Sequence, residues 1–188
     1  MFPTPPWILP LATSTPTPTP TSRHKRIIVA LTGATGTIVG IRALLALRRL
    51  HVETHLILSK WAETTVRHET SYTVPNVRSL ADHVYRNNDL AAPIASVSFR
   101  VDGMILIPCS MKTLAAITIG FGEDLVARAA DNMLSVTRHG AVVFLPVPAF
   151  YTRPAGLEEV VDRIAGRVLD LFGLEIEGLP RWKGLGRE

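Results

Sequence analysis

Short apolar segments alternate with amphipathic helical segments along most of the chain, and this alternation constrains the fold more than any other feature. The segments "RIIVALTG", "ETHLILS", "GMILIPCS" and "AVVFLPVP" are rich in apolar and β-branched residues, as strands buried on both faces are. Helical periodicity lies between them, for example over residues 37–50, and again over residues 157–173. We therefore expect a doubly wound, three-layer α/β fold with a parallel sheet, of the flavodoxin or Rossmann-like kind.

The first 25 residues differ in composition from the rest of the chain. Residues 1–22 are dominated by Pro, Thr and Ser, which favour extended, solvated chain. We expect a disordered tail over residues 1–25 and a single domain over residues 26–188. The tail has no acidic residue, which suits a mitochondrial transit peptide, although its prolines oppose the amphipathic helix of such peptides. An untargeted tail on a cytoplasmic protein is the alternative.

Composition argues against several classes of protein. No apolar run reaches the roughly 18 residues that span a bilayer, so we expect no membrane span and assign the 47% hydrophobic content partly to subunit contacts. The net charge is +4, but Lys and Arg are scattered, which argues against nucleic-acid binding. Cys109 is the only cysteine, so an internal disulfide and a multi-cysteine metal site are excluded. We expect no metal.

Small hydrogen-bond donors follow three of the predicted strands. Ligands of open parallel sheets bind beyond the carboxyl ends of the strands, where free N–H groups of helix N-termini attract anions. Gly33 and Gly36 follow the first strand, although glycines there often only turn the chain. The donors after the second and third strands are Ser59, Lys60, Ser110, Lys112 and Thr113. Together they predict a site for a planar cofactor that carries a phosphate.

Five further residues have two interpretations each. Glu69 is either a general acid or base or a solvated acid on a helix. Tyr151 and Arg167 either converge on an anion or serve as a loop anchor and a surface cation. Trp182 either covers an apolar ligand or pins the C-terminal segment, and Cys109 is more typical of a small buried residue than of a nucleophile.

The chain resembles the UbiX-type flavin prenyltransferases, including their fungal members associated with phenylacrylic acid decarboxylases. The resemblance extends over residues 26–182 and is carried by "RIIVALTGATGTIVGIRAL", "THLILSKWAETTVRHET", "GMILIPCSMKTLAAI", "DLVARAADNML" and "GAVVFLPVPAFYTRP". It implies an enzyme that joins a dimethylallyl group from dimethylallyl phosphate to N5 and C6 of FMN, without a metal. It further implies homo-oligomers, commonly dodecamers, and a product, prenylated FMN, that a UbiD-type decarboxylase uses.

The resemblance also implies roles for individual residues. Gly33, Ala34 and Thr35 would line the flavin, and Thr35 stands where the family usually has a catalytic serine. Ser59 would hold the ribityl phosphate and ring edge together with the turn formed by Ser110, Met111, Lys112 and Thr113.

Four more positions match residues that the family uses in catalysis or in binding the prenyl donor. Glu69 would be the acid/base carboxylate near the flavin, which reverses the preference for a solvated acid. Tyr151 and Arg167 would grip the phosphate of the prenyl donor, where charge develops on the leaving group. Trp182 would lie near the prenyl group.

One stretch departs from the family, because the chain passes directly from Asp131 to "NMLSVTRHG". Similar proteins have a further strand, a catalytic loop and parts of two helices there, about 25–30 residues or one βα unit. We expect a sheet one strand shorter, in which "GMILIPCS" and "AVVFLPVP" pair directly across a fused helix over residues 123–139. A catalytically impaired FMN-binding or assembly subunit, from a splice or gene-model variant, is one alternative. A flavin-dependent decarboxylase that uses Cys109 or Glu69 is another.

Overall fold

A computed structural model describes residues 24–96, 98–119, 121–136, 142 and 144–179. Most of the predicted tail, residues 1–23, lies outside the described residues, and so does Trp182. The elements, in chain order, are β1 (Arg26–Leu31), α1 (Thr37–Arg49), β2 (Glu53–Leu58), α2 (Lys60–Glu69), α3 (Val74–Arg78), β3 (His83–Arg86), η1 (Pro93–Ala95), β4 (Gly103–Leu106), α4 (Met111–Thr118), α5 (Leu125–Val136), η2 (Phe150–Thr152) and α6 (Leu157–Asp170).

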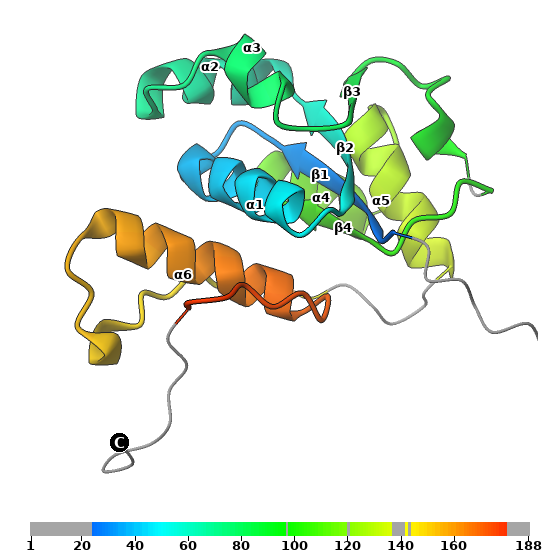
Figure 1. Cartoon of the computed structure of the whole chain (residues 1–188). Coiled ribbons are helices and arrows are strands. Elements are labelled where there is room, and N and C mark those ends of the chain that lie inside the picture. Colours follow the sequence, from blue (N-terminus) through cyan, green and yellow to red (C-terminus); the bar gives the residue numbers. More distant parts are fainter. Residues whose placement is uncertain (1–23, 97, 120, 137–141, 143, 180–188) are drawn as a thin grey trace, which may run out of the picture.

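The sheet has four strands in the order β3-β2-β1-β4, and all of its pairings are parallel (Figure 1). Arg26 of β1 lies opposite Glu53 of β2, and Ile27 lies opposite Gly103 of β4. The chain therefore proceeds outward from β1 through β2 to β3 and then returns to add β4 on the other side. This is the strand order of a doubly wound α/β fold, and it confirms the predicted fold class.

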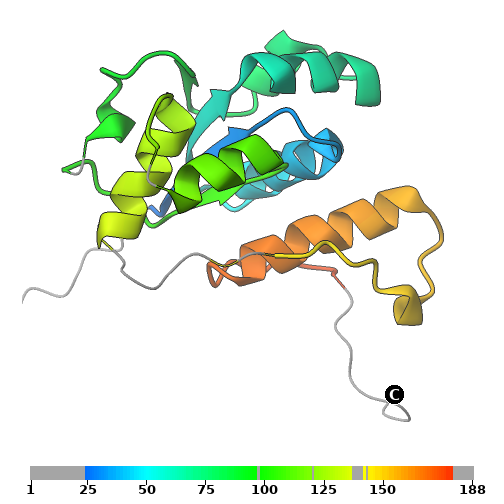
Figure 2. The same ribbon diagram turned by 180° about the vertical axis from the view of Figure 1, so that it is seen from behind.

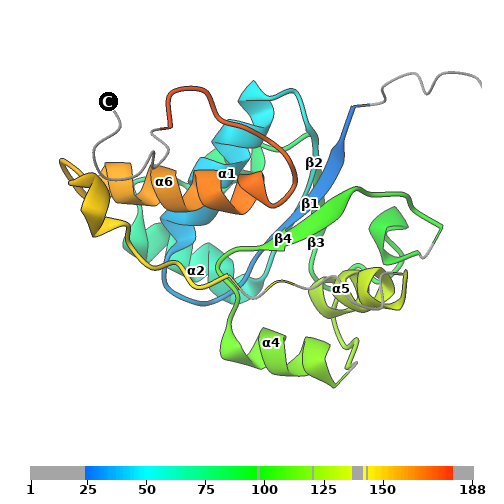
Figure 3. The ribbon, with the colours of Figure 1, turned by 90° about the horizontal axis from the view of Figure 1, so that it is seen from below.

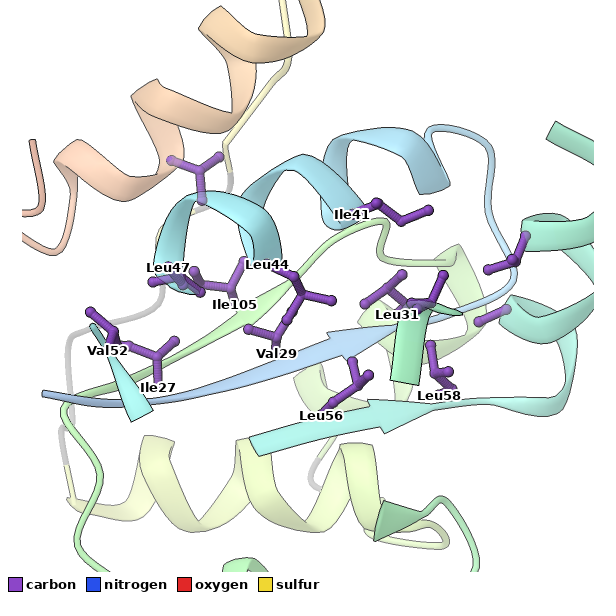
Figure 4. Packing of buried hydrophobic residues seen from close by; sticks show 14 of the residues in the cluster. Ile27, Val29, Leu31, Ile41, Leu44, Leu47, Val52, Leu56, Leu58 and Ile105 are labelled. Carbon is purple, nitrogen blue, oxygen red and sulfur yellow. The ribbon is translucent and has the colours of Figure 1, made fainter. Parts of the chain in front are cut away.

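Helices cover both faces of the sheet (Figures 2 and 3). On one face, alternate residues of β1 pack against α1, as Val29 does with Leu44 and Leu47 (Figure 4). On the other face, Ile28 packs in a second cluster that includes Leu125 of α5. Because β1 is buried on both faces from Ile27 to Leu31, these residues are all apolar, and only Arg26 at its start is polar.

Strand β3 was missed in the sequence because its residues lack the apolar pattern of a buried strand. His83, Val84 and Arg86 are exposed, and Tyr85 is half-buried, since β3 pairs with β2 alone at one edge of the sheet. An edge strand with one solvated face needs few apolar residues. The segment "HVYR" therefore gave no signal that distinguished it from the irregular chain around it.

The predicted strand over residues 141–148 is wrong for its described part. Residues 142 and 144–148 are in no strand, and β1 is the one strand that β4 pairs with among the described residues. Pro146 and Pro148 have no N–H to donate to a ladder, and Phe144 packs against the cluster beneath α1 instead. Helix α5 confirms the helical prediction over residues 125–136. The described residues of "AVVFLPVP" do not form the predicted pairing with "GMILIPCS".

None of the helices in the described part of the chain is both long enough and apolar enough to cross a membrane.

Candidate functional site

A cavity of about 460 Å³ lies beyond the carboxyl ends of the strands. Its walls come from the loops after β1, β2, β3 and β4 and from the first turns of α2, α4 and α5. The point where the strand order reverses lies between β1 and β4, and ligands of doubly wound sheets bind at that point. The topology thus places this cavity where the sequence predicted a ligand.

Thr32 fixes the two loops that diverge at this point. Its side chain is buried, and its hydroxyl donates to the carbonyl of Pro108 at 2.9 Å. The same hydroxyl oxygen accepts from the backbone N–H of Ser110 at 2.7 Å. The Thr32 hydroxyl therefore forms two hydrogen bonds, one as donor and one as acceptor, that connect the end of β1 to the start of α4. Sequence reasoning passed over Thr32 because a threonine within "LTG" is also an ordinary residue at the end of a strand.

Two helices begin at the cavity, and a serine caps each of them. Ser59 Oγ accepts from the N–H of Ala62 at 3.1 Å at the start of α2, and Ser110 Oγ accepts from the N–H of Thr113 at 3.2 Å at the start of α4. Lys60 and Lys112 follow these caps and also line the cavity. Helix N-termini carry partial positive charge, so this wall suits a phosphate or another anion.

Gly33 is required by a close approach of α2. A Cβ atom at this position would lie 2.3 Å from Cβ of Trp61, a separation that side chains do not adopt. Trp61 thereby closes over the loop after β1, while most of its side chain stays exposed at the rim of the cavity. The loop after β1 and the start of α2 form one continuous wall.

The start of α5 forms a different wall, which carries carboxylate and amide side chains. Asn87, which directly follows β3, donates from Nδ2 to Asp124 Oδ2 at 3.1 Å and accepts from the N–H of Val126 at 3.3 Å. Asp124 Oδ1 accepts from the N–H of Ala127 at 2.9 Å, so its carboxylate caps the helix. Glu123 lines the same wall. The sequence gave no sign of this wall because β3 had not been recognised.

The structure brings six of the predicted site residues to the cavity: Gly33, Ser59, Lys60, Ser110, Lys112 and Thr113. Ala34, Thr35 and Met111 are neighbours of these residues in the chain but do not line the cavity. Glu69 Oε2 accepts from the N–H of Gly36 at 3.0 Å and from the N–H of Thr37 at 3.2 Å. Its carboxylate thus lies at the N-terminus of α1, one residue beyond Thr35.

The residues expected to bind the prenyl donor are not brought to this cavity by the described part of the chain. Tyr151 lies in η2, and Arg167 lies on the exposed side of α6. Helix α6 packs against α1, on the opposite face of the sheet from α4 and α5 (Figure 3). Neither residue lines the cavity.

A second cluster of titratable groups lies on β2 and β3, toward their amino ends. The ligand atoms of Glu53, His55 and His83 lie within 4.8 Å of one another. Arg26 Nε donates to Glu53 Oε1 at 2.8 Å and holds the pKa of that carboxyl below its usual value. The His55 and His83 rings stack with their centroids 4.6 Å apart, and Nε2 of each ring faces Glu53 Oε1, at 3.0 Å from His55 and 3.6 Å from His83.

Burial governs the charge of His55 itself. Loss of water around the buried ring lowers the pKa of His55, and the hydroxyl of Tyr85 lies 3.0 Å from its Nδ1. His55 is therefore neutral near pH 7.

The sequence "HVETH" also places His51 four residues before His55, but His51 lies in the turn before β2. The prediction that no metal takes part stays a prediction.

Cys109 lies just before Ser110 and is half-buried. Burial raises the pKa of the Cys109 thiol, so the thiol is protonated near neutral pH. The thiolate is the nucleophilic form of cysteine, and this environment does not favour it.

Comparisons with known proteins agree with this geometry. The chain matches the Flavoprotein family over residues 16–165. It is 47% identical to the flavin prenyltransferase PAD1, mitochondrial, of Saccharomyces cerevisiae, over 87% of this chain and 77% of that protein. A crystal structure of AnUbiX (PadA1) in complex with FMN and dimethylallyl pyrophosphate superposes with a TM-score of 0.81 at 52% identity, over 86% of this chain and 99% of the other.

A dodecameric FMN-dependent UbiX-like decarboxylase from Escherichia coli O157:H7 superposes with a TM-score of 0.79 at 44% identity, over 85% of this chain and 100% of the other. The alignment with the yeast protein runs over 187 positions but includes only 87% of this 188-residue chain, so the relative has residues without a counterpart here. This agrees with the interpretation that an internal segment is missing. The extent and level of these similarities show that the chain belongs to the flavoprotein family and, within it, to the UbiX-like flavin prenyltransferases.

Proposed function

We propose that this chain is a flavin prenyltransferase that joins a dimethylallyl group from dimethylallyl phosphate to FMN. The observation that carries the proposal is the meeting of two serine-capped helix N-termini, at Ser59 and Ser110, in one cavity at the reversal of the strand order. The relatives named for this activity, and the FMN in the AnUbiX structure, support it. Prenylated FMN would pass to a UbiD-type decarboxylase.

The residues at the cavity suit FMN by their chemistry. Hydroxyl, ammonium and backbone donors to a phosphate come from Ser59, Lys60, Ser110 and Lys112. Gly33 lets the loop after β1 approach Trp61 of α2 closely. FMN supplies the N5 and C6 atoms to which the dimethylallyl group is joined. The chain binds and orients the flavin and narrows the access of water to it.

We assign the chemical roles to Thr35, in the loop after β1, and to Glu69, whose carboxylate lies at the start of α1. Glu69 is exposed, and its carboxylate is held by two backbone N–H groups, so it stays in one position beside the loop that carries Thr35. A carboxylate in such a position is suited to receive and return a proton. The family resemblance assigns further flavin contacts to Ala34 and Met111, which are chain neighbours of lining residues but do not themselves line the cavity.

Tyr151, Arg167 and Trp182 would bind the prenyl donor. Within one chain, Tyr151 and Arg167 lie away from the cavity, so we propose that a neighbouring copy brings them to it. A homo-oligomer, with a dodecamer as the expected size, is supported by the dodecameric E. coli relative and by the exposed apolar side chains Met111, Ile119, Phe150 and Leu157. The molar mass from light scattering tests this assembly.

The second candidate is an FMN-binding or assembly subunit with impaired catalysis. It is favoured by the alignment with the yeast protein, in which the relative has residues without a counterpart here. The family segment that we expect to be absent after Asp131 would carry a catalytic loop. The third interpretation is a flavin-dependent decarboxylase that uses Cys109 or Glu69. Burial raises the pKa of the Cys109 thiol, which disfavours Cys109 as its nucleophile.

One experiment separates the first two candidates. The purified chain is incubated without oxygen with reduced FMN and, in separate arms, dimethylallyl phosphate or dimethylallyl pyrophosphate, and the flavin is analysed by mass spectrometry. A flavin heavier by one dimethylallyl group supports the transferase. Unchanged flavin that nevertheless binds the protein contradicts transfer and supports the impaired subunit.

We also propose that residues 1–25 direct the single domain of residues 26–188 to mitochondria. The mitochondrial yeast relative and the absence of acidic residues in this segment support the proposal. A fluorescent fusion of residues 1–25 should accumulate in mitochondria, whereas a fusion of residues 26–188 should remain in the cytoplasm. The reverse distribution, or the same one for both fusions, would contradict it.

A further inference from the structure

The cluster of Glu53, His55 and His83 lies at the opposite end of the strands from the cavity. Glu53 begins β2 and His83 begins β3, whereas the cavity lies beyond the last residues of both strands. Among the described residues, this is the one group of three or more His, Cys, Asp or Glu side chains whose ligand atoms lie within 4.8 Å of one another. The proposed flavin chemistry does not use it.

The register of the sheet brings the three side chains to one face. His55 lies directly opposite His83 in the parallel pairing of β2 with β3. Glu53 precedes His55 by two residues on the same strand, so both side chains point to the same side of the sheet. The three ligand groups therefore come from two hydrogen-bonded strands, which hold a site more precisely than loops do.

The separations of the ligand atoms suit a small divalent cation. Glu53 Oε1 lies 3.0 Å from His55 Nε2 and 3.6 Å from His83 Nε2. In a tetrahedral Zn²⁺ site the metal–ligand distances are about 2.0–2.2 Å, so neighbouring ligand atoms are about 3.3–3.6 Å apart. Two imidazoles and a carboxylate are a ligand set that Zn²⁺ takes, with its fourth position left to water.

Tyr85 and Phe99 hold the buried ring of His55 in place. The Tyr85 hydroxyl lies 3.0 Å from His55 Nδ1, and Phe99 packs edge-on against the ring with the centroids 5.1 Å apart. A hydroxyl that accepts from Nδ1–H leaves Nε2 with its lone pair directed at the cluster. Histidines that bind metals commonly donate their other ring N–H to such a partner, which fixes the orientation of the ring.

His83 is the ligand that has to move. The two imidazole planes are inclined by only 19°, whereas two rings that share one ion must direct their Nε2 lone pairs to one point. The side chain of His55 is 3% exposed, while that of His83 is 52% exposed on the edge strand. A rotation of the His83 ring about its side-chain bonds therefore closes the site.

Arg26 limits the affinity of this site for a cation. Its Nε donates to Glu53 Oε1 at 2.8 Å, and this is the oxygen that faces both rings. A bound cation replaces this hydrogen bond and is repelled by the guanidinium group. Arg26 keeps its contacts with the carbonyl of Arg100 and with the ring of Phe99. We therefore expect binding of modest affinity.

We propose that Glu53, His55 and His83 form a Zn²⁺ site that joins the edge strand β3 to β2 and keeps one position open to solvent. The ion is structural, because the cavity lies at the other end of the strands. Strand β3 leads directly into Asn87, which holds Asp124 at the start of α5, so an ion on β3 also stabilises this corner of the fold. The expectation that prenyl transfer needs no metal is unaffected.

Calorimetric titration with Zn²⁺ of the full chain, purified without a histidine tag and freed of metal with a chelator, tests the site. We expect one Zn²⁺ per chain. His83→Ala removes an exposed ligand and should weaken binding at least about tenfold, since loss of a mere partner of a ligand already costs that much. The matched control is His68→Ala, which removes another exposed histidine, on α2, and should bind Zn²⁺ like the unmodified chain.

A second variant and a second readout address the fold. Glu53→Gln keeps an oxygen that accepts from Arg26 but loses the charge that the ion needs, so it should also bind Zn²⁺ weakly. At a hundredfold excess over its Kd, Zn²⁺ should raise the Tm of the unmodified chain and of His68→Ala by about 5 °C. The Tm of His83→Ala should not respond.

The outcomes for zinc and for flavin are separate. No saturable Zn²⁺ binding to the unmodified chain would overturn the inference, and so would equal affinity in His83→Ala and Glu53→Gln. His83 does not line the cavity, so His83→Ala should keep the Kd for FMN of the unmodified chain. A chain that binds FMN but not Zn²⁺ refutes the zinc site alone, and one that binds Zn²⁺ but not FMN refutes the proposed function alone.

Discussion

The hydroxyl of Thr32 accepts a hydrogen bond from the backbone N–H of Ser110 at 2.7 Å and joins the ends of two neighbouring strands. These strands, β1 and β4, flank the point where the strand order reverses. The hydrogen bond therefore sets the separation of the loop after β1 and the first turn of α4, which form two walls of the cavity.

Replacement of this hydroxyl should loosen the cavity. Thr32→Val keeps the shape of the side chain but leaves the N–H of Ser110 without its acceptor, which costs about 1–3 kcal/mol of stability. Chemical denaturation should show this loss, and an FMN titration should show weaker binding. Thr32→Ser, which restores the hydroxyl, should recover most of both; equal behaviour of the two variants would contradict the role of the hydrogen bond.

Gly33 offers a steric test of the wall formed with Trp61. Gly33→Ala places a Cβ atom 2.3 Å from Cβ of Trp61, so α2 must shift. We expect a loss of about 1–3 kcal/mol in the free energy of unfolding, as in other overpacked sites, together with weaker FMN binding. Gly156→Ala is the matched control, because a Cβ atom at residue 156 meets nothing within 4 Å and the backbone there is extended.

The two lysines should recognise the phosphate and not the ring. Removal of one charged donor by Lys60→Gln or Lys112→Gln should cost about 1–2 kcal/mol, or roughly tenfold in the Kd for FMN. The Kd for riboflavin, which has no phosphate, should stay the same. Equal losses for FMN and riboflavin would mean that the lysines contribute to the fold of the cavity and not to phosphate binding.

The pH dependence of stability should reflect His55. Burial lowers the pKa of His55 below its ordinary value of 6.5, so below pH 6.5 the unfolded chain binds a proton that the folded chain does not. The free energy of unfolding should therefore fall as the pH decreases from 6.5 toward the pKa of the folded state. Glu53, whose pKa is also lowered, keeps its contribution until the pH falls below 4.5.

Thermal unfolding between pH 7.5 and 5 measures this dependence. His55→Phe fills the same space without a titrating group and should flatten the decrease in Tm over this range. His24→Phe is the control, since His24 is exposed before β1. An unchanged pH profile in His55→Phe would assign the decrease to other groups.

Much of the fold could be predicted from the sequence, and the failures have physical causes. Strands β1 and β2 were recognised by their continuous apolar runs, Ile27–Leu31 and Leu56–Leu58, as expected of strands between two helical layers. Strand β3 lies at an edge and carries polar residues, so it left no pattern. The sequence at residues 141–148 has the pattern of a strand, but Pro146 and Pro148 oppose ladder pairing, and Phe144 packs against the cluster beneath α1.

The candidate site was predictable where it is made of strand ends and less so where it depends on tertiary structure. Ser59 and Ser110 follow apolar strands and begin helices, so their position beside the cavity could be inferred from the chain alone. Asn87, Phe121 and Asp124 enter the cavity only because β3 and the turn after α4 bring them there. The contact of Glu69 with the N-terminus of α1 likewise joins residues from different elements.

Glu69 provides a test of the catalytic assignment. Glu69→Gln keeps an oxygen that can accept from the N–H groups of Gly36 and Thr37 but cannot take up a proton at neutral pH. We expect prenyl transfer to be abolished while the Kd for FMN and the Tm stay close to those of the unmodified chain. Unaltered transfer in Glu69→Gln would remove Glu69 from the chemistry.

The most direct test of the central claim is a titration of the purified chain with FMN, followed by flavin emission and by calorimetry. We predict saturable binding of one FMN per chain at the cavity. This binding should be lost in the double variant Ser59→Ala with Ser110→Ala, because both caps that order the helix N-termini are removed. The absence of saturable binding in the folded, unmodified chain would show that the cavity is not a flavin site.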